Sequence, residues 1–244
     1  MLAVDYSPKF KLILFDLDGT LVNTLPELTD AINDTLPQRY GTEPCQNDLV
    51  QSWIGNGAAN LLKLALNHVG VEPSMSQKEF ELVWPEFQEA YAKRCGTNSS
   101  VYPGVTPCLS ALKKSGYRMA VLTNKESLFA QKVISDNGMS HFFESIIAGD
   151  SFEYKKPDPR VMTLSLEQFN LNKQDVLFVG DSMIDIETGV SSGVETWAVS
   201  YGYNHGEFDA ASTSSIADRL IDDFDQLRRL LTTESTVNEV RYCD

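Results

Sequence analysis

Three absences narrow what this chain of 244 residues can be. Its four cysteines are scattered without CxxC spacing, which argues against a disulfide framework and favours free thiols in a reducing, cytoplasmic compartment. No apolar run approaches the roughly 18 residues that a membrane helix needs. The N-terminal stretch lacks a basic region followed by a long apolar one, so we expect no signal peptide. The cysteines are Cys45, Cys95, Cys108 and Cys243.

Basic residues are also scarce. The chain has 20 Lys and Arg against 34 Asp and Glu, a formal charge of −14. Such a surface repels nucleic acid and anionic membranes, so neither is an expected partner. An anionic ligand would be repelled at long range as well, and a site for one must carry its own positive charge. The histidines His68, His141 and His205 are isolated in the sequence and suggest no zinc site.

What the sequence does have is an alternation of apolar, β-branched runs with amphipathic segments. Runs that are apolar on both faces suit a parallel sheet covered by helices. We therefore predict an α/β fold with a doubly wound parallel sheet. The predicted strands are residues 11–16, 118–124, 145–150, 175–181, 195–202 and 219–221, and the predicted helices are residues 106–116, 127–138, 158–170, 182–193 and 223–231.

One segment breaks this alternation. Between the first strand and VYPGV (101–105), four successive stretches place apolar residues at helical spacing, where a crossover needs only one helix. We therefore predict an all-helical cap domain, residues 24–96, inserted after strand 1. The α/β core would comprise residues 1–23 and 97–232, and residues 233–244 would form a polar tail.

Polar residues gather where three of the predicted strands end. Since ligands bind outside the carboxyl ends of strands in open α/β sheets, these side chains should meet in one crevice. Asp16 and Asp18 also point the same way if their strand continues, because strand side chains alternate. The predicted crevice residues are Asp16, Asp18, Thr123, Asn124, Asp181 and Asp185.

Clustered carboxylates raise one another's pKa or require a cation. Oxygen ligands suit Mg²⁺, which binds through one or two carboxylates plus a substrate phosphate. Asp16 and Asp181 are the candidate ligands, with the main-chain carbonyl of Asp18 as another. The alternative is a plain turn with solvated acids, but an apolar strand precedes the pair and no glutamate closes a calcium-type loop.

A bound phosphate would give each of these residues a task. Asp16 could attack phosphorus, and Asp18 could protonate the leaving oxygen and later activate water. Donors for the phosphoryl oxygens would come from Thr20, Thr123 and Asn124. A lysine to offset the charge would come from EYKKPDP (153–159), which offers both Lys155 and Lys156.

Four motifs in this order resemble those of the haloacid dehalogenase-like superfamily of phosphotransferases. They are DLDGT (16–20), TNK (123–125), KPDP (156–159) and GDSMID (180–185), and together they span nearly the whole chain. The resemblance implies that Asp16 is the nucleophile, Asp18 the general acid and base, and Lys156 the motif lysine. It also implies that Thr123 binds phosphate, that Asp181 and Asp16 hold Mg²⁺, and that Asp185 is a carboxylate on the metal side.

The stretches FDLDGTLVNTLPEL and WIGNGAANLLKLAL further resemble the bacterial phosphoglycolate phosphatases. This resemblance implies 2-phosphoglycolate as the small phosphate ester substrate, with a cap loop, Gly55, Asn56 and Gly57, that reaches it. Asn23 and Thr24 stand where members often have Asp and Ser. The open alternatives are a phosphatase of sugar phosphates, nucleotides or pyrophosphate, a β-phosphoglucomutase-like mutase, and a non-catalytic phosphometabolite-binding protein. The sequence leaves monomer or homodimer undecided.

Overall fold

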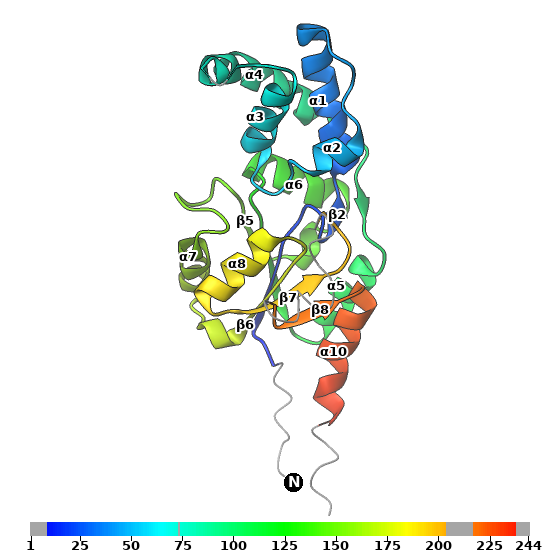
Figure 1. Ribbon diagram of the computed structural model, residues 1–244. Helices are drawn as coiled ribbons and strands as arrows, with labels where there is room; N and C mark the ends of the chain where they lie inside the picture. The colour runs from blue at the N-terminus through cyan, green and yellow to red at the C-terminus, as the bar shows by residue number, and fades with distance from the viewer. Residues whose placement is uncertain (1–8, 73, 204–216, 238–244) are drawn as a thin grey trace, which may run out of the picture.

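The computed structural model describes residues 9–72, 74–203 and 217–237, and its core is built on one sheet of six parallel strands (Figure 1). The strand order is β5-β4-β1-β6-β7-β8, so the first strand lies in the middle with β4 and β6 on its two sides. The strands are β1 (Leu12–Phe15), β4 (Arg118–Leu122), β5 (Ile146–Ile147), β6 (Val176–Gly180), β7 (Glu195–Val199) and β8 (Arg219–Ile221).

Helices cover both faces of the sheet, which confirms the predicted doubly wound α/β fold. Ile13 and Phe15 of β1 pack with one set of helices, α5, α6 and α10, while Leu12 and Leu14 point to the other face and pack with α7. Both faces are buried, as continuous apolar strands require. These helices are α5 (Val105–Lys114), α6 (Ser127–Asp136), α7 (Pro159–Phe169), α8 (Met183–Ser192) and α10 (Phe224–Val237).

The chain leaves the core after β1 and forms four helices before it returns, as the sequence predicted. These helices, called the helical insert here, lie beyond the carboxyl ends of the strands (Figure 1). The insert comprises α1 (Leu25–Tyr40), α2 (Asn47–Gln51), α3 (Ala58–His68) and α4 (Ser76–Arg94). A short antiparallel pair that the sequence did not reveal, β2 (Val22–Asn23) with β3 (Ser100–Val101), joins the two connecting segments.

The end of the chain differs from the prediction of a polar tail from residue 233. Helix α10 continues to Val237, with Leu227 and Leu231 buried nearer its start. Residues 238–244, with Cys243, and His205 lie outside the described residues. The other three cysteines are buried and free. Among the helices of the described residues, none has the length and apolar character required to cross a membrane.

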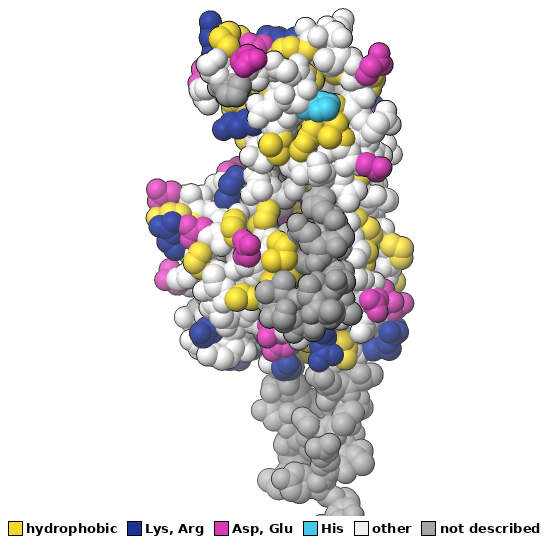
Figure 2. Space-filling model, viewed as in Figure 1, with side chains coloured by type: hydrophobic (Ala, Val, Ile, Leu, Met, Phe, Trp, Pro, Cys, Tyr) yellow, Lys and Arg dark blue, Asp and Glu magenta, His cyan; other side chains and the backbone are white. Residues whose placement is uncertain are grey.

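Acidic side chains are spread over both parts of the molecule in the surface view (Figure 2). They lie on the helical insert and on the core, and lysines and arginines are interspersed with them. The negative charge of the chain is therefore distributed over this face, and it does not form one acidic patch there.

Candidate active site

The candidate site lies at the carboxyl ends of the three central strands. Asp16 follows β1, Thr123 follows β4 and Asp181 follows β6, and these strands are direct neighbours in the sheet. The parallel register brings their ends to one edge, where the helical insert covers them. Six sequence-predicted residues, Asp16, Asp18, Thr123, Asn124, Asp181 and Asp185, meet here.

Asp16 is held by a buried lysine. The Lys156 ammonium lies 2.8 Å from Asp16 Oδ1 and 2.6 Å from Asp185 Oδ1, and its side chain is 2% exposed. Burial raises the pKa of Asp16 to about 7, although the charge of Lys156 acts in the opposite direction. The two carboxylates raise the pKa of Lys156 despite its burial, so this lysine stays charged.

Lys155, the other lysine of this motif, has a different environment. It is exposed, and its ammonium donates to the Asn56 carbonyl of the helical insert at 2.8 Å. The structure thus distinguishes the two adjacent lysines that the sequence offered. Lys156 faces the carboxylates, whereas Lys155 ties the loop before α3 to the core.

Asp181 is fully buried and is oriented from two sides. The Thr20 hydroxyl donates to Asp181 Oδ1 at 2.7 Å, and the Tyr203 backbone N–H donates to Oδ2, also at 2.7 Å. Burial and the neighbouring Asp185 raise the pKa of Asp181 well above its ordinary value. Thr20, expected to serve phosphoryl oxygens, is instead directed at this carboxylate in the structure.

Two glycines allow the chain to approach Asp181 closely. A Cβ on Gly19 would lie 2.2 Å from Asp181 Oδ2, and a Cβ on Gly202 would lie 2.6 Å from the same atom. Both glycines also have φ near +90°, which side chains rarely adopt. The glycine of DLDGT is therefore required by space as well as by backbone conformation.

The carboxylates fit a divalent cation. Oxygens of Asp16, Asp181 and Asp185 lie within 4.8 Å of one another, and all three residues are buried. Lys156 supplies only one positive charge to three carboxylates, so the cluster has an excess of buried negative charge that a cation would offset. An all-oxygen set matches the preference of hard ions such as Mg²⁺.

The Asp185 carboxylate accepts hydrogen bonds from neighbouring groups of the protein. Its Oδ1 accepts from Lys156, and its Oδ2 accepts from the Ser182 hydroxyl at 2.7 Å and the Ser182 N–H at 3.0 Å, which caps α8. Both oxygens are thus engaged by protein donors. The geometry makes Asp185 a residue that positions Lys156 and the β6–α8 turn.

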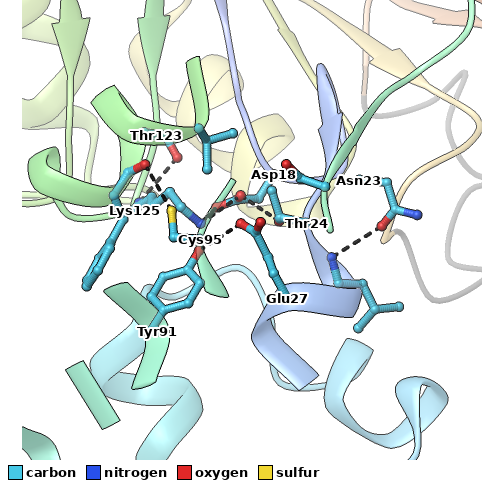
Figure 3. A network of polar contacts seen from close by, with 12 residues as sticks. Asp18, Asn23, Thr24, Glu27, Tyr91, Cys95, Thr123 and Lys125 are labelled. Atoms are coloured by element: carbon cyan, nitrogen blue, oxygen red, sulfur yellow. Dashed lines mark hydrogen bonds and ion pairs between the residues drawn. The ribbon is translucent and has the colours of Figure 1, made fainter. Parts of the chain in front are cut away.

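Asp18 has a separate lysine, which the sequence analysis did not single out. The Lys125 ammonium lies 2.9 Å from Asp18 Oδ1 and 3.1 Å from Oδ2, and the Thr24 hydroxyl donates to Oδ1 at 2.7 Å (Figure 3). The Lys125 side chain is 3% exposed. Its only sequence signal is its place after Thr123 and Asn124 at the end of a strand.

Groups from the helical insert and its return segment surround Lys125 (Figure 3). Its ammonium lies 5.0 Å from the centre of the Tyr91 ring. Glu27 of α1 accepts from the Gly96 N–H at 2.7 Å, and burial raises the pKa of Glu27 to about 7 although Lys125 opposes this. Burial also raises the pKa of Cys95 to about 12. The lysine therefore stands where core and insert meet.

The loop before α3 closes onto the core. Asn124 Nδ2 donates to the Gly55 carbonyl and to the Lys156 carbonyl, each at 2.9 Å, so the Asn124 amide links the loop to the KPDP segment. A Cβ on Gly57 would lie 2.9 Å from the Asn124 carbonyl. The Thr123 hydroxyl accepts from the Lys125 N–H at 3.2 Å, which leaves its proton available for another acceptor.

A cavity of about 30 Å³ lies between these groups. Core residues with charges or donors form one side, and apolar residues of the insert form the other. The lining consists of Asp16, Asp18, Leu28, Ile54, Gly55, Gly57, Ala58, Leu61, Thr123, Asn124 and Lys125. A second hollow of about 240 Å³ extends from Asp16 and Asp18 past Asn56 to Asp181 and Tyr203.

Comparison with known proteins gives a consistent result. A family model described as haloacid dehalogenase-like hydrolase matches residues 13–199. Phosphoglycolate phosphatase 1 of Pseudomonas aeruginosa is 35% identical over 230 residues, which cover 94% of this chain and 82% of that protein. Phosphoglycolate phosphatase of Haemophilus influenzae is 36% identical over 225 residues, which cover 91% and 99%.

A solved structure shares the whole architecture. The crystal structure of a predicted phosphoglycolate phosphatase from Haemophilus somnus superimposes with a TM-score of 0.81 at 34% identity. The match covers 91% of this chain and 98% of the other. The similarity therefore extends over core and helical insert together.

Proposed function

Since this chain belongs to the haloacid dehalogenase-like hydrolases and is a phosphoric monoester hydrolase like its phosphatase relatives, we propose that its substrate is 2-phosphoglycolate. The reaction would be Mg²⁺-dependent and would yield glycolate and phosphate through an aspartyl-phosphate. Curated relatives named phosphoglycolate phosphatase, which align over most of both chains, support this substrate.

Asp16 is the proposed nucleophile and Asp18 the proposed acid and base. An Asp16 oxygen attacks phosphorus, the phosphorus–oxygen ester bond breaks, and Asp18 gives its proton to the departing oxygen. Water then attacks the phosphorus of the aspartyl-phosphate while Asp18 takes a proton from it, which restores Asp16 and releases phosphate. The observation that carries this proposal is that Asp16 and Asp18 line one small cavity and pair with different buried lysines.

The metal would be held by Asp16 and Asp181, with the main-chain carbonyl of Asp18 as a further ligand. Asp185 would position Lys156 and the β6–α8 turn beside these ligands. A bound divalent cation offsets the negative charge of the carboxylates and of a phosphoryl group. Thr20 contributes by fixing Asp181 through its 2.7 Å hydrogen bond.

Lys156 and Thr123 are the proposed phosphate-binding groups, in addition to the metal. The Lys156 ammonium offsets charge on the phosphoryl oxygens while it keeps Asp16 in place, which is electrostatic stabilisation of the transition state. Thr123 offers its free hydroxyl proton, and Asn124 holds the loop of residues 55–57 over the site.

We assign residues 24–96 to a cap domain and residues 1–23 and 97–232 to the catalytic core. The cap would close over the crevice and exclude bulk water, with Gly55, Asn56 and Gly57 at the contact. The contacts of Asn124 with Gly55 and of Lys155 with Asn56 support this proposal.

Phosphate release from a panel of esters tests the proposal. The panel holds 2-phosphoglycolate, hexose phosphates, nucleoside monophosphates and pyrophosphate, with Mg²⁺ present and Asp16→Asn as the blank. We expect 2-phosphoglycolate to lead in kcat/KM by at least about tenfold, about 1.4 kcal/mol of discrimination. If another ester has the highest kcat/KM, the proposed substrate is refuted but the proposed mechanism is not. If no ester is hydrolysed faster than in the Asp16→Asn blank, both are refuted.

A further inference from the structure

We propose that Lys125 binds the carboxylate of the substrate and so selects short phosphorylated carboxylic acids, an inference that rests on the phosphatase function proposed above. Among the described residues that line the small cavity, Lys125 is the one cation, and it stands beside two carboxylates. Without it, an anionic leaving group placed there would meet the carboxylates of Asp16 and Asp18 and no positive charge among these lining residues.

The ammonium of Lys125 has a free donor for such a group. A lysine donates three hydrogen bonds. Within the part of the chain that the structure describes, two hydrogen bonds are found, both to Asp18. Lys125 lines the cavity and its side chain is 3% exposed, so a carboxylate that entered the cavity would meet this ammonium shielded from water and would bind it strongly.

The position of Lys125 sets the length of the acid. Asp18, the proposed proton donor, must contact the ester oxygen. The Lys125 ammonium lies 2.9 Å from Oδ1 of the same Asp18 carboxylate. In 2-phosphoglycolate only one carbon separates the ester oxygen from the carboxyl carbon. A leaving group whose ester oxygen contacts Asp18 therefore places its carboxylate next to the Lys125 ammonium. A longer spacer between the ester oxygen and the carboxylate would place the carboxylate beyond this ammonium.

The opposite wall of the cavity disfavours leaving groups that carry several hydroxyls. Leu28 of α1, Ile54, and Leu61 of α3 face the site from the helical insert. Sugar hydroxyls directed at these side chains would lose their hydrogen bonds to water without replacement. Charge on one side and apolar walls on the other together favour a compact acid over a hexose.

Two alternative roles for the lysines near the cavity lead to different kinetic results. Lys125 could serve only to position Asp18, in which case its loss would impair every phosphate ester equally. Lys155 is the other nearby cation, since its ammonium would lie 3.8 Å from a Cβ on Gly57, but it is exposed and already bonded to Asn56. Comparing a substrate whose leaving group carries a carboxylate with one of similar size whose leaving group is uncharged separates these possibilities.

The test compares 2-phosphoglycolate with ethyl phosphate, which lacks the carboxylate. We expect the ratio of their kcat/KM values to be at least about 100 in the wild type and to fall below about 5 in Lys125→Met. The ratio should stay within about twofold in Lys155→Met and in Lys78→Met, an exposed lysine of α4. An unchanged ratio in Lys125→Met, or a ratio lost in Lys155→Met instead, would overturn the assignment.

A binding measurement decides the question even if Lys125→Met does not turn over. Calorimetry on Asp16→Asn with Mg²⁺ should show 2-phosphoglycolate binding at least about 30-fold more tightly than in Asp16→Asn/Lys125→Met, and ethyl phosphate binding changed by less than about threefold. Equal weakening of both ligands contradicts the inference. If the wild type prefers another ester in the panel, the proposed substrate fails separately, since that result does not involve Lys125.

Discussion

At the scale of single residues, each of the two aspartates of DLDGT pairs with a different buried lysine. Lys156 pairs with Asp16 and Lys125 pairs with Asp18, and both ammonium groups are almost inaccessible to solvent. Neighbouring carboxylates in different environments can take different roles, and this is compatible with the proposal that Asp16 attacks while Asp18 carries a proton. Removing Lys156 would leave the buried carboxylates of Asp16 and Asp185 without their lysine, and breaking a buried ion pair typically costs about 3–5 kcal/mol.

Glu27 gives a pH-dependent prediction about stability. Burial raises its pKa from 4.5 to about 7, so the folded protein favours the protonated form. The stabilisation is fully present below pH 4.5 and is lost as the pH rises through 7. Since glutamine stays neutral, we expect Glu27→Gln to gain about 2 kcal/mol of unfolding free energy, relative to the wild type, between pH 5 and pH 8. Denaturant unfolding at both pH values measures this difference.

The matched control is Glu43→Gln, because Glu43 is exposed. Its difference from the wild type should be the same at pH 5 and pH 8. A Glu27→Gln variant that behaves like this control would show that Glu27 is not held in the buried environment described here.

The aspartates of the site and the lysine pair of KKPDP could be predicted from the sequence, but Lys125 and Glu27 could not. Asp16 and Asp181 directly follow apolar strands and Asp18 comes two residues after Asp16, and that local pattern places them at the sheet edge. Lys125 and Glu27 act through burial and through contacts between segments far apart in the chain. The local sequence around a lysine does not tell whether its side chain is solvated or buried. The roles of Lys125 and Glu27 therefore become visible only when the helical insert is packed on the core.

At the scale of elements, the loop before α3 is the point where the insert meets the catalytic edge. Gly57 has φ +85°, and a Cβ there would lie 2.9 Å from the Asn124 carbonyl. We expect Gly57→Ala to push this loop away from the core and to raise KM for 2-phosphoglycolate about tenfold or more. Steady-state kinetics together with a melting curve measures the effect and checks that the fold persists.

Gly70 provides the control for this substitution. Its φ is +86°, but a Cβ there would have no neighbour within 4 Å. Both alanine variants place a side chain at a φ that side chains rarely adopt, but only Gly57 has a neighbour within contact distance of the new Cβ. If Gly70→Ala raises KM as much as Gly57→Ala, the loop does not act through that contact.

Element boundaries show where local patterns stop being informative. The six strands and the helices between them were predicted from apolar periodicity, which core packing enforces. The pair β2–β3 has two residues per strand and no periodic signal, and it exists because the two crossings between core and insert run side by side. Helix α10 continues to Val237 through polar residues that the sequence analysis assigned to a tail.

At the scale of the whole molecule, the site concentrates negative charge in a protein that already has a formal charge of −14. Asp16, Asp181 and Asp185 lie within 4.8 Å of one another at its centre, so a cation that binds the folded state stabilises it. At about 100 times its Kd, Mg²⁺ should raise Tm by about 5–10 °C. Scanning calorimetry with and without Mg²⁺ measures this independently of activity.

Two variants test whether the Mg²⁺ effect belongs to this cluster. Asp181→Asn should reduce the Mg²⁺-dependent rise in Tm to about 1 °C or less, whereas Asp48→Asn, an exposed position on α2, should keep it. An equal rise in Tm for both variants would place the effect on the general acidic surface instead.

The proposed mechanism depends on phosphorylation of Asp16. The most direct measurement is to mix Asp18→Asn with p-nitrophenyl phosphate and Mg²⁺, quench, reduce with borohydride and map the peptides by mass spectrometry. Because borohydride reduces an acyl phosphate to an alcohol, we predict homoserine at position 16, and none in Asp16→Asn/Asp18→Asn. Reduction at another carboxylate, or rapid release of nitrophenol with no homoserine at position 16, would contradict the role of Asp16 as nucleophile.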